Sequence, residues 1–78
     1  MTLHKMRDGP GKNRRMDRLL RDLVLCEPHE RMLAARTLGE IGNPSALEAL
    51  RERHRNDSSK AVRFEADRAI NKIMRSHY

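Results

Sequence analysis

Residues 29–50, HERMLAARTLGEIGNPSALEAL, decide the fold of this chain. Within them Ala34, Leu38 and Ile41 recur at spacings of four and three, the period of one face of an amphipathic helix. Gly42 follows directly, and glycine is the residue that most often ends a helix. The first half of the stretch therefore predicts a helix that starts near Pro28 and stops at Gly42.

The second half of the stretch begins a new helix. Asn43 suits the capping position and Pro44 the first helical turn, where its missing N–H costs nothing. We expect this helix to cover residues 44–55. Its inward side chains should be Ala46, Leu47, Ala49 and Leu50.

Two further helices are predicted on either side. One covers residues 16–26 and ends near Cys26, because Pro28 disfavours helical backbone just before it. Its apolar stripe is Met16, Leu19, Leu20, Leu23 and Val24. The other follows the polar break 56–59, in which Asp57, Ser58 or Ser59 could cap it. Its apolar face is Val62, Ala66, Ala69, Ile70 and Ile73.

The second and fourth helices repeat one another at a constant shift of 32 positions. The matching pairs are Arg31 with Arg63, Ala34 with Ala66, Leu38 with Ile70, and Ile41 with Ile73. A helix–turn–helix period of this length is typical of α-solenoids.

On these residues the chain resembles the short HEAT-like repeats first described in phycobilisome lyases, which read roughly V-R-x-x-A-A-x-A-L-G-x-I-G and then A-x-x-A-L. The matching residues are Arg31, Ala34, Ala35, Leu38, Gly39, Ile41, Gly42, Ala46, Ala49 and Leu50. The second copy departs at Asn71 and Met74, where the family has glycines, which predicts a terminal capping helix. The resemblance spans about residues 16–77 and implies an all-α fold, a short α-solenoid of about four antiparallel helices over residues 15–78.

The resemblance also implies which surface binds a partner. In such repeats the second helix of each unit usually lines the concave face, here residues 16–26 and 44–55. The candidate protein-binding residues are Arg18, Arg21, Glu48, Arg51, Glu52 and Arg55. Their mixed charge favours a protein surface over a uniform phosphate track.

The net charge of +6 is concentrated in an N-terminal arm, which we expect to be flexible over residues 1–14. Residues 1–15 carry five basic side chains against Asp8 alone, a balance of +4. Such an arm is either a solvated tail or a set of phosphate contacts. The candidate phosphate contacts are Lys5, Arg7, Lys12, Arg14 and Arg15.

A solenoid of about two units leaves apolar surface uncovered, because stable stacks normally need about three or more. We expect self-association, or docking on another helical protein, through the last helix. The candidate edge is Phe64, Ile70, Ile73 and Met74. The alternative is a small monomer whose last helix packs fully against the second.

The sequence predicts no enzyme, no cofactor and no metal site. The four histidines are scattered, and Cys26 with His29 falls short of the four ligands that structural zinc needs. No apolar stretch approaches the ~18 residues of a membrane span, and the lone cysteine agrees with the cytoplasm. The predicted function is a protein–protein interaction or assembly module, and the alternative is a nucleic-acid-binding helical module.

Overall fold

The computed structural model describes residues 14–77, and every regular element among them is helical. The elements are α2 (Arg14–Leu25), α3 (Pro28–Ile41), the short 3-10 helix η1 (Pro44–Ala46), α4 (Leu47–Asn56) and α5 (Lys60–His77). The predicted all-α fold is confirmed. Helix α2 begins at Arg14, just before the predicted start of the helical domain, and the rest of the predicted arm lies outside the described residues.

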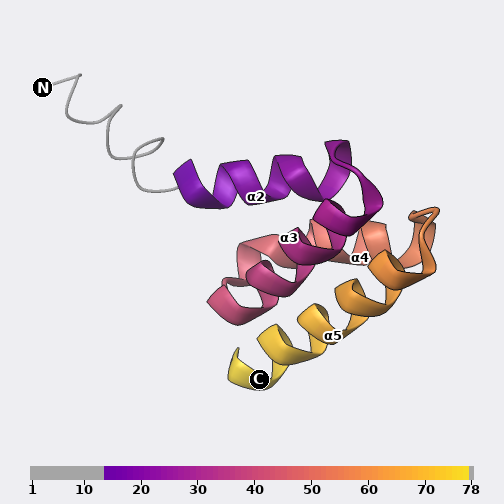
Figure 1. The fold of residues 1–78 in the computed structure, drawn as a ribbon. Coiled ribbons are helices and arrows are strands. Elements are labelled where there is room, and N and C mark those ends of the chain that lie inside the picture. The colour runs from indigo at the N-terminus through magenta and orange to yellow at the C-terminus, as the bar shows by residue number, and fades with distance from the viewer. Residues whose placement is uncertain (1–13, 78) are drawn as a thin grey trace, which may run out of the picture.

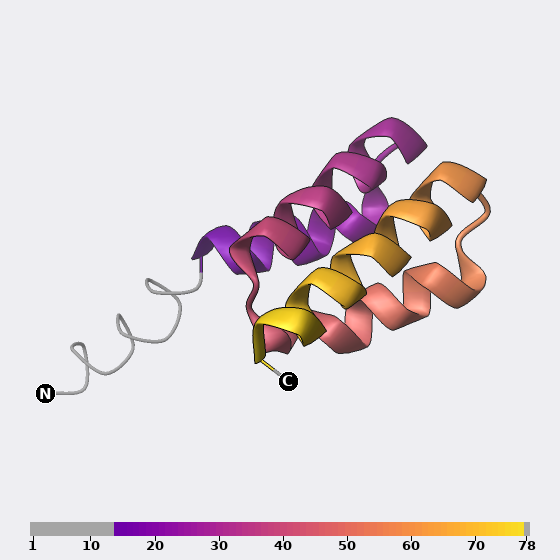
Figure 2. The same ribbon diagram turned by 90° about the horizontal axis from the view of Figure 1, so that it is seen from below.

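The helices form two layers (Figures 1 and 2). Figure 2 shows α3 and α5 side by side in one layer, with α2 and α4 behind them. Successive helices run in opposite directions, as expected for a short α-solenoid. None of the helices in residues 14–77 is long and apolar enough to cross a membrane.

One aliphatic core joins both layers. Its largest fully buried side chains are Leu23, Leu38, Leu50, Val62 and Ile73, which come from all four helices. Burying a side chain of this kind contributes about 1.5–3 kcal/mol. Both halves of the repeat therefore contribute side chains to one shared core.

Two side chains assigned to apolar faces lie at the surface instead. Val24 is 50% exposed, because the adjacent Leu23 takes the inward position on α2. Ile41 is 39% exposed, whereas its repeat partner Ile73 is fully buried. The difference arises because Ile73 points into the shared core, whereas no described helix fully covers the corresponding side of α3.

The turn between α3 and α4 forms as the sequence predicts. Gly42 has a left-handed φ of 76°, and its N–H donates to the Leu38 carbonyl at 3.1 Å. The Asn43 side chain then accepts the Ser45 N–H at 2.9 Å, and Pro44 opens the 3-10 turn η1. A left-handed glycine followed by an Asn-Pro start thus reverses the chain in very few residues.

Helices α3 and α5 approach each other closely at Gly39. A Cβ atom at residue 39 would lie 2.8 Å from the Ala69 Cα and 2.9 Å from its Cβ. Neither of these atoms can move without moving the α5 backbone. The glycine therefore sets the spacing of the α3–α5 layer.

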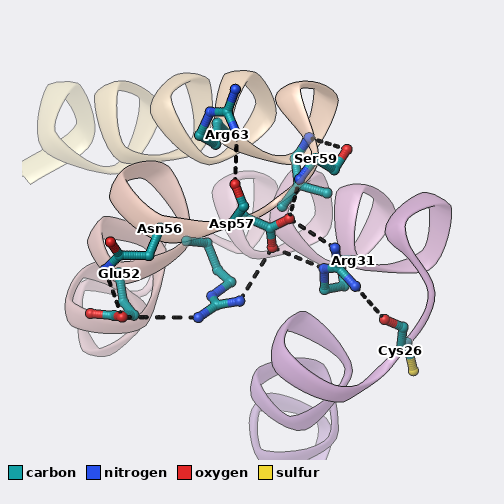
Figure 3. A network of polar contacts seen from close by, with 9 residues as sticks. Cys26, Arg31, Glu52, Asn56, Asp57, Ser59 and Arg63 are labelled. Atoms are coloured by element: carbon teal, nitrogen blue, oxygen red, sulfur yellow. Dashed lines mark hydrogen bonds and ion pairs between the residues drawn. The ribbon is translucent and has the colours of Figure 1, made fainter.

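A buried carboxylate links the loop between α4 and α5 to the first turn of α3 (Figure 3). The side chain of Asp57, between α4 and α5, is fully buried and accepts two bonds from Arg31, at 2.9 Å from Nε and 2.8 Å from a terminal nitrogen. It also accepts from Arg53 at 3.3 Å and from the Ser59 N–H at 2.9 Å. Such two-point arginine–carboxylate pairs are among the stronger polar contacts in proteins.

The same cluster reaches the loops before α3 and α5. Arg31 donates to the Cys26 carbonyl at 2.8 Å, and Arg63 donates to the Asp57 carbonyl at 2.6 Å. The two arginines that match in the repeat thus make the same contact, because each donates a hydrogen bond to a backbone carbonyl in the loop before its own helix. Of the three candidate caps for α5, Ser59 takes the position, since its carbonyl accepts the Arg63 N–H at 3.0 Å.

The ionised form of Asp57 is the stable form in the fold. Burial by itself would raise the pKa of Asp57, but hydrogen bonds from Arg31 and Ser59 and the charges of Arg31 and Arg53 together hold that pKa below its usual range. The carboxylate thus stabilises the fold above the unfolded-state pKa of about 4. This contribution is lost as the pH falls through the lower folded-state pKa.

We predict that Asp57→Asn lowers the free energy of unfolding by about 3–5 kcal/mol, because it leaves the largely buried Arg31 without its counter-charge and removes the closer carboxylate from Arg53. Urea unfolding at pH 7 followed by circular dichroism measures the loss. The stability of the wild type should also fall as the pH drops below about 4, more steeply than that of the variant. A loss below about 1 kcal/mol would show that the cluster behaves as an ordinary surface ion pair.

We predict that Gly39→Ala destabilises the protein although alanine is the better helix former by about 1 kcal/mol. Its Cβ has to push α5 away, and overpacking of this kind costs about 1–3 kcal/mol. Thermal unfolding measures the change. A control is Ala61→Gly on α5, an exposed position where mainly the helix-propensity term acts. A stabilised Gly39→Ala protein would contradict the proposed spacing.

Candidate protein-binding surfaces

The six residues predicted for the concave face all lie exposed on α2 and α4. These residues, called the α2/α4 surface from here on, are Arg18, Arg21, Glu48, Arg51, Glu52 and Arg55. The two helices are neighbours in one layer (Figure 2), anchored from below by the buried Leu23 and Leu50. Four positive and two negative side chains are therefore exposed on two packed helices of the same layer.

The charges on α4 are only loosely paired with one another. Glu52 lies 3.7 Å from Arg55 and 4.0 Å from Arg53, and it accepts a hydrogen bond from Asn56 at 2.8 Å. Arg51 contacts the sulfur of Met74 at 3.9 Å. Exposed pairs of this kind contribute about 0–1 kcal/mol each. A partner can therefore engage these side chains at little cost to the fold.

The predicted self-association edge on α5 needs a correction. Ile73 is fully buried in the core and cannot belong to an exposed edge. Ile70 and Met74 are half-buried and pack against that core, so only Phe64 is largely exposed, at 60%. The Arg68 guanidinium lies over the Phe64 ring, 5.9 Å from its centre. Sequence periodicity identified the face of α5 but not which of its residues the other helices cover.

The predicted phosphate contacts are divided between two regions. Lys5, Arg7 and Lys12 lie outside the described residues. Arg14 and Arg15 form the first turn of α2, and both are exposed.

A basic groove between α3 and α5 was not anticipated from the sequence. It measures about 380 Å³, and Arg36 lies in it with its guanidinium 3.2 Å from the Glu65 carboxylate. Its other basic side chains are Arg68, Lys72 and Arg75. Their spacings of four and three on α5 are a helical signal, but only the side-by-side packing of α3 and α5 places Arg36 beside them.

A second, smaller groove of about 210 Å³ lies between α2 and α3. It is called the α2/α3 groove below, and its lining residues are Leu19, Asp22, Glu30, Leu33, Ala34 and Thr37. Its floor is apolar and one end carries two carboxylates.

The environment of Cys26 gives it little reactivity. Burial raises the pKa of the thiol, and the neighbouring carboxylates of Asp22 and Glu30 raise it further. The sulfur lies 3.5 Å from an Asp22 oxygen and is half-buried rather than fully buried. Within residues 14–77 no group of three or more His, Cys, Asp and Glu side chains could hold a metal ion.

Comparison with known proteins agrees with this architecture. The family model for HEAT repeats matches residues 17–76, which covers all four helices. No curated protein and no solved structure matches the chain. With a repeated helix pair, a shared core and a family match over most of its length, the chain belongs to the HEAT-repeat family.

Proposed function

We propose that this chain is a protein–protein interaction or assembly module that binds its partner through the α2/α4 surface. The observation that carries the proposal is the exposure of six charged side chains of both signs on two neighbouring helices of one layer. Mixed charge suits a protein partner, because complementary potentials set orientation and specificity in protein interfaces. HEAT repeats are commonly interaction or scaffold modules, and the family is generally non-catalytic.

Two finer assignments are part of the proposal. We assign the repeats to the phycobilisome-lyase type, supported by the motif residues Arg31, Ala34, Leu38 and Gly39. We further propose that the chain is not an enzyme. A cytoplasmic location stays a prediction from the lone cysteine.

We predict that reversing two charges on the α2/α4 surface abolishes partner capture. The test variant is Arg21→Glu with Arg51→Glu, and the control is Lys72→Glu with Arg75→Glu on α5, which changes the net charge equally on the other layer. Immobilised full-length chains are exposed to native cell extract, and retained proteins are quantified by mass spectrometry. Because central arginines contribute about 2 kcal/mol or more, partner affinity should fall about 30-fold or more.

The control variant determines how this result is interpreted. A specific partner should be retained by the wild type and by the α5 variant alone. Equal loss from both variants would mean a non-specific charge effect. Equal retention by both would mean that the partner binds elsewhere, which would refute the α2/α4 surface.

A second candidate function is binding to nucleic-acid phosphates. The observation that favours it is the exposure of Arg14, Arg15 and Arg18 in the first turns of α2, where the basic arm joins the helix. With a single Phe and a single Tyr in the chain, stacking on single-stranded bases has little support. The candidate interaction is thus sequence-independent contact with duplex phosphates.

We predict for this second function that duplex DNA binds at low salt and dissociates at moderate salt. Neutralising Lys5, Arg7, Lys12, Arg14 and Arg15 to glutamine should reduce the slope of log affinity against log salt by up to about 4–5, at about 0.9 for each phosphate that is no longer neutralised. Fluorescence anisotropy with a labelled duplex measures both. Absence of binding by the wild type at low salt would eliminate the function.

A further inference from the structure

The outer side of α3 has the character of a helix-packing face. Inside the fold, α5 packs through the face that carries Ala66, Ala69 and Ile73, all buried. The equivalent residues of α3 in the repeat are Ala34, Thr37 and Ile41. Ala34 and Thr37 line the α2/α3 groove, and Ile41 is 39% exposed. Ala34 is itself buried, at 4% exposure, but Thr37 is half-buried and Ile41 is exposed, so the helices of residues 14–77 cover this face of α3 less completely than the matching face of α5.

The opposite end of the stack is closed to a further helix of this kind. Helix α3 receives α5 through two small buried residues, Ala35 and Gly39. The equivalent residues of α5 in the repeat are Asp67 and Asn71. A helix that packed on α5 in the same way would bury the charge of Asp67. It would also clash with the side chain of Asn71, which stands where α3 has the side-chain-free Gly39. A head-to-tail stack of copies is therefore disfavoured, and α5 has the polar outer face of a terminal cap.

Opposite charges lie along the side of α2 that borders the α2/α3 groove. Along α2, Arg15, Leu19 and Asp22 are spaced by four and three and so lie on one face in successive turns. Asp22 and Glu30 form the acidic end of the groove, and Arg15 is exposed on α2 one turn before Leu19. A second copy related to the first by a two-fold axis would place its Arg15 against the acidic end of the first.

We propose that this chain forms a two-fold dimer with a second copy of itself through the α2/α3 groove. The apolar floor, with Leu33 at 40% exposure, supplies the centre of the interface. Arg15 of each copy, placed against Asp22 and Glu30 of the other, supplies two equivalent charge contacts. A two-fold contact of this kind closes after two copies. The inference rests on the proposed interaction function and adds a partner and a surface to it.

Sedimentation equilibrium of the full chain from micromolar to millimolar concentration tests the dimer. The mass should rise from the 9.1 kDa of one chain to twice that value and stop there. Leu33→Glu should raise the dissociation constant at least about tenfold. Phe64→Glu should leave it unchanged, since it places the same charge at an exposed apolar residue on α5. Circular dichroism confirms that both variants keep their helices.

A charge exchange tests the two-fold geometry. Arg15→Glu and Asp22→Arg each place like charges opposite one another and should each weaken the dimer. An equimolar mixture of the two variants should recover it, because both like-charge contacts are then replaced by opposite-charge contacts across the mixed pair.

Four results would overturn the inference: a constant 9.1 kDa mass, growth beyond the mass of two chains, a dimer lost in Phe64→Glu, or no recovery in the mixture. A monomer that still captures its partner through the α2/α4 surface would refute the dimer alone. An intact dimer without partner capture would refute the proposed function alone.

Discussion

The buried Asp57 carboxylate is the contact on which the rest of the fold depends. It lies between α4 and α5, yet its strongest partner, Arg31, belongs to α3, and Arg31 in turn holds the carbonyl at the end of α2. One ionised side chain therefore sets the positions of four helices. In a 78-residue chain with an aliphatic core this matters, because small domains bury a smaller share of their surface and have little stability to spare.

The second constraint is the close approach of α3 and α5 at Gly39. The Asp57 cluster fixes one end of the helix pair, and the missing side chain at Gly39 lets the helices meet further along. These two features act in different ways. The Asp57 cluster acts through charge and hydrogen bonding, whereas Gly39 acts by having no side chain between the two helices. Together they fix the geometry of the α3–α5 layer, while α2 and α4 carry the mixed charges.

The two layers therefore give the molecule surfaces of different character. The α2/α4 surface is polar and mixed in charge, the α3/α5 groove is predominantly basic, and the α2/α3 groove is apolar with charged ends. The two ends of the stack are also unequal, since the outer side of α3 carries the exposed apolar Leu33 and Ile41, whereas α5 carries Asp67 and Asn71. A repeat protein this short can therefore direct different partners to different faces.

The sequence by itself determined the helices, their ends and the repeat, because these depend on local spacing and on capping residues such as Gly42, Asn43 and Pro44. It also identified the six exposed residues of the α2/α4 surface, since each lies opposite an apolar stripe. Only the tertiary structure decided that Ile73 is buried while Ile41 is exposed, and that Asp57 is a buried anchor rather than the N-terminal cap of α5. Those outcomes depend on which helix covers which face, and residues 26 positions apart, such as Arg31 and Asp57, meet only after the helices have packed.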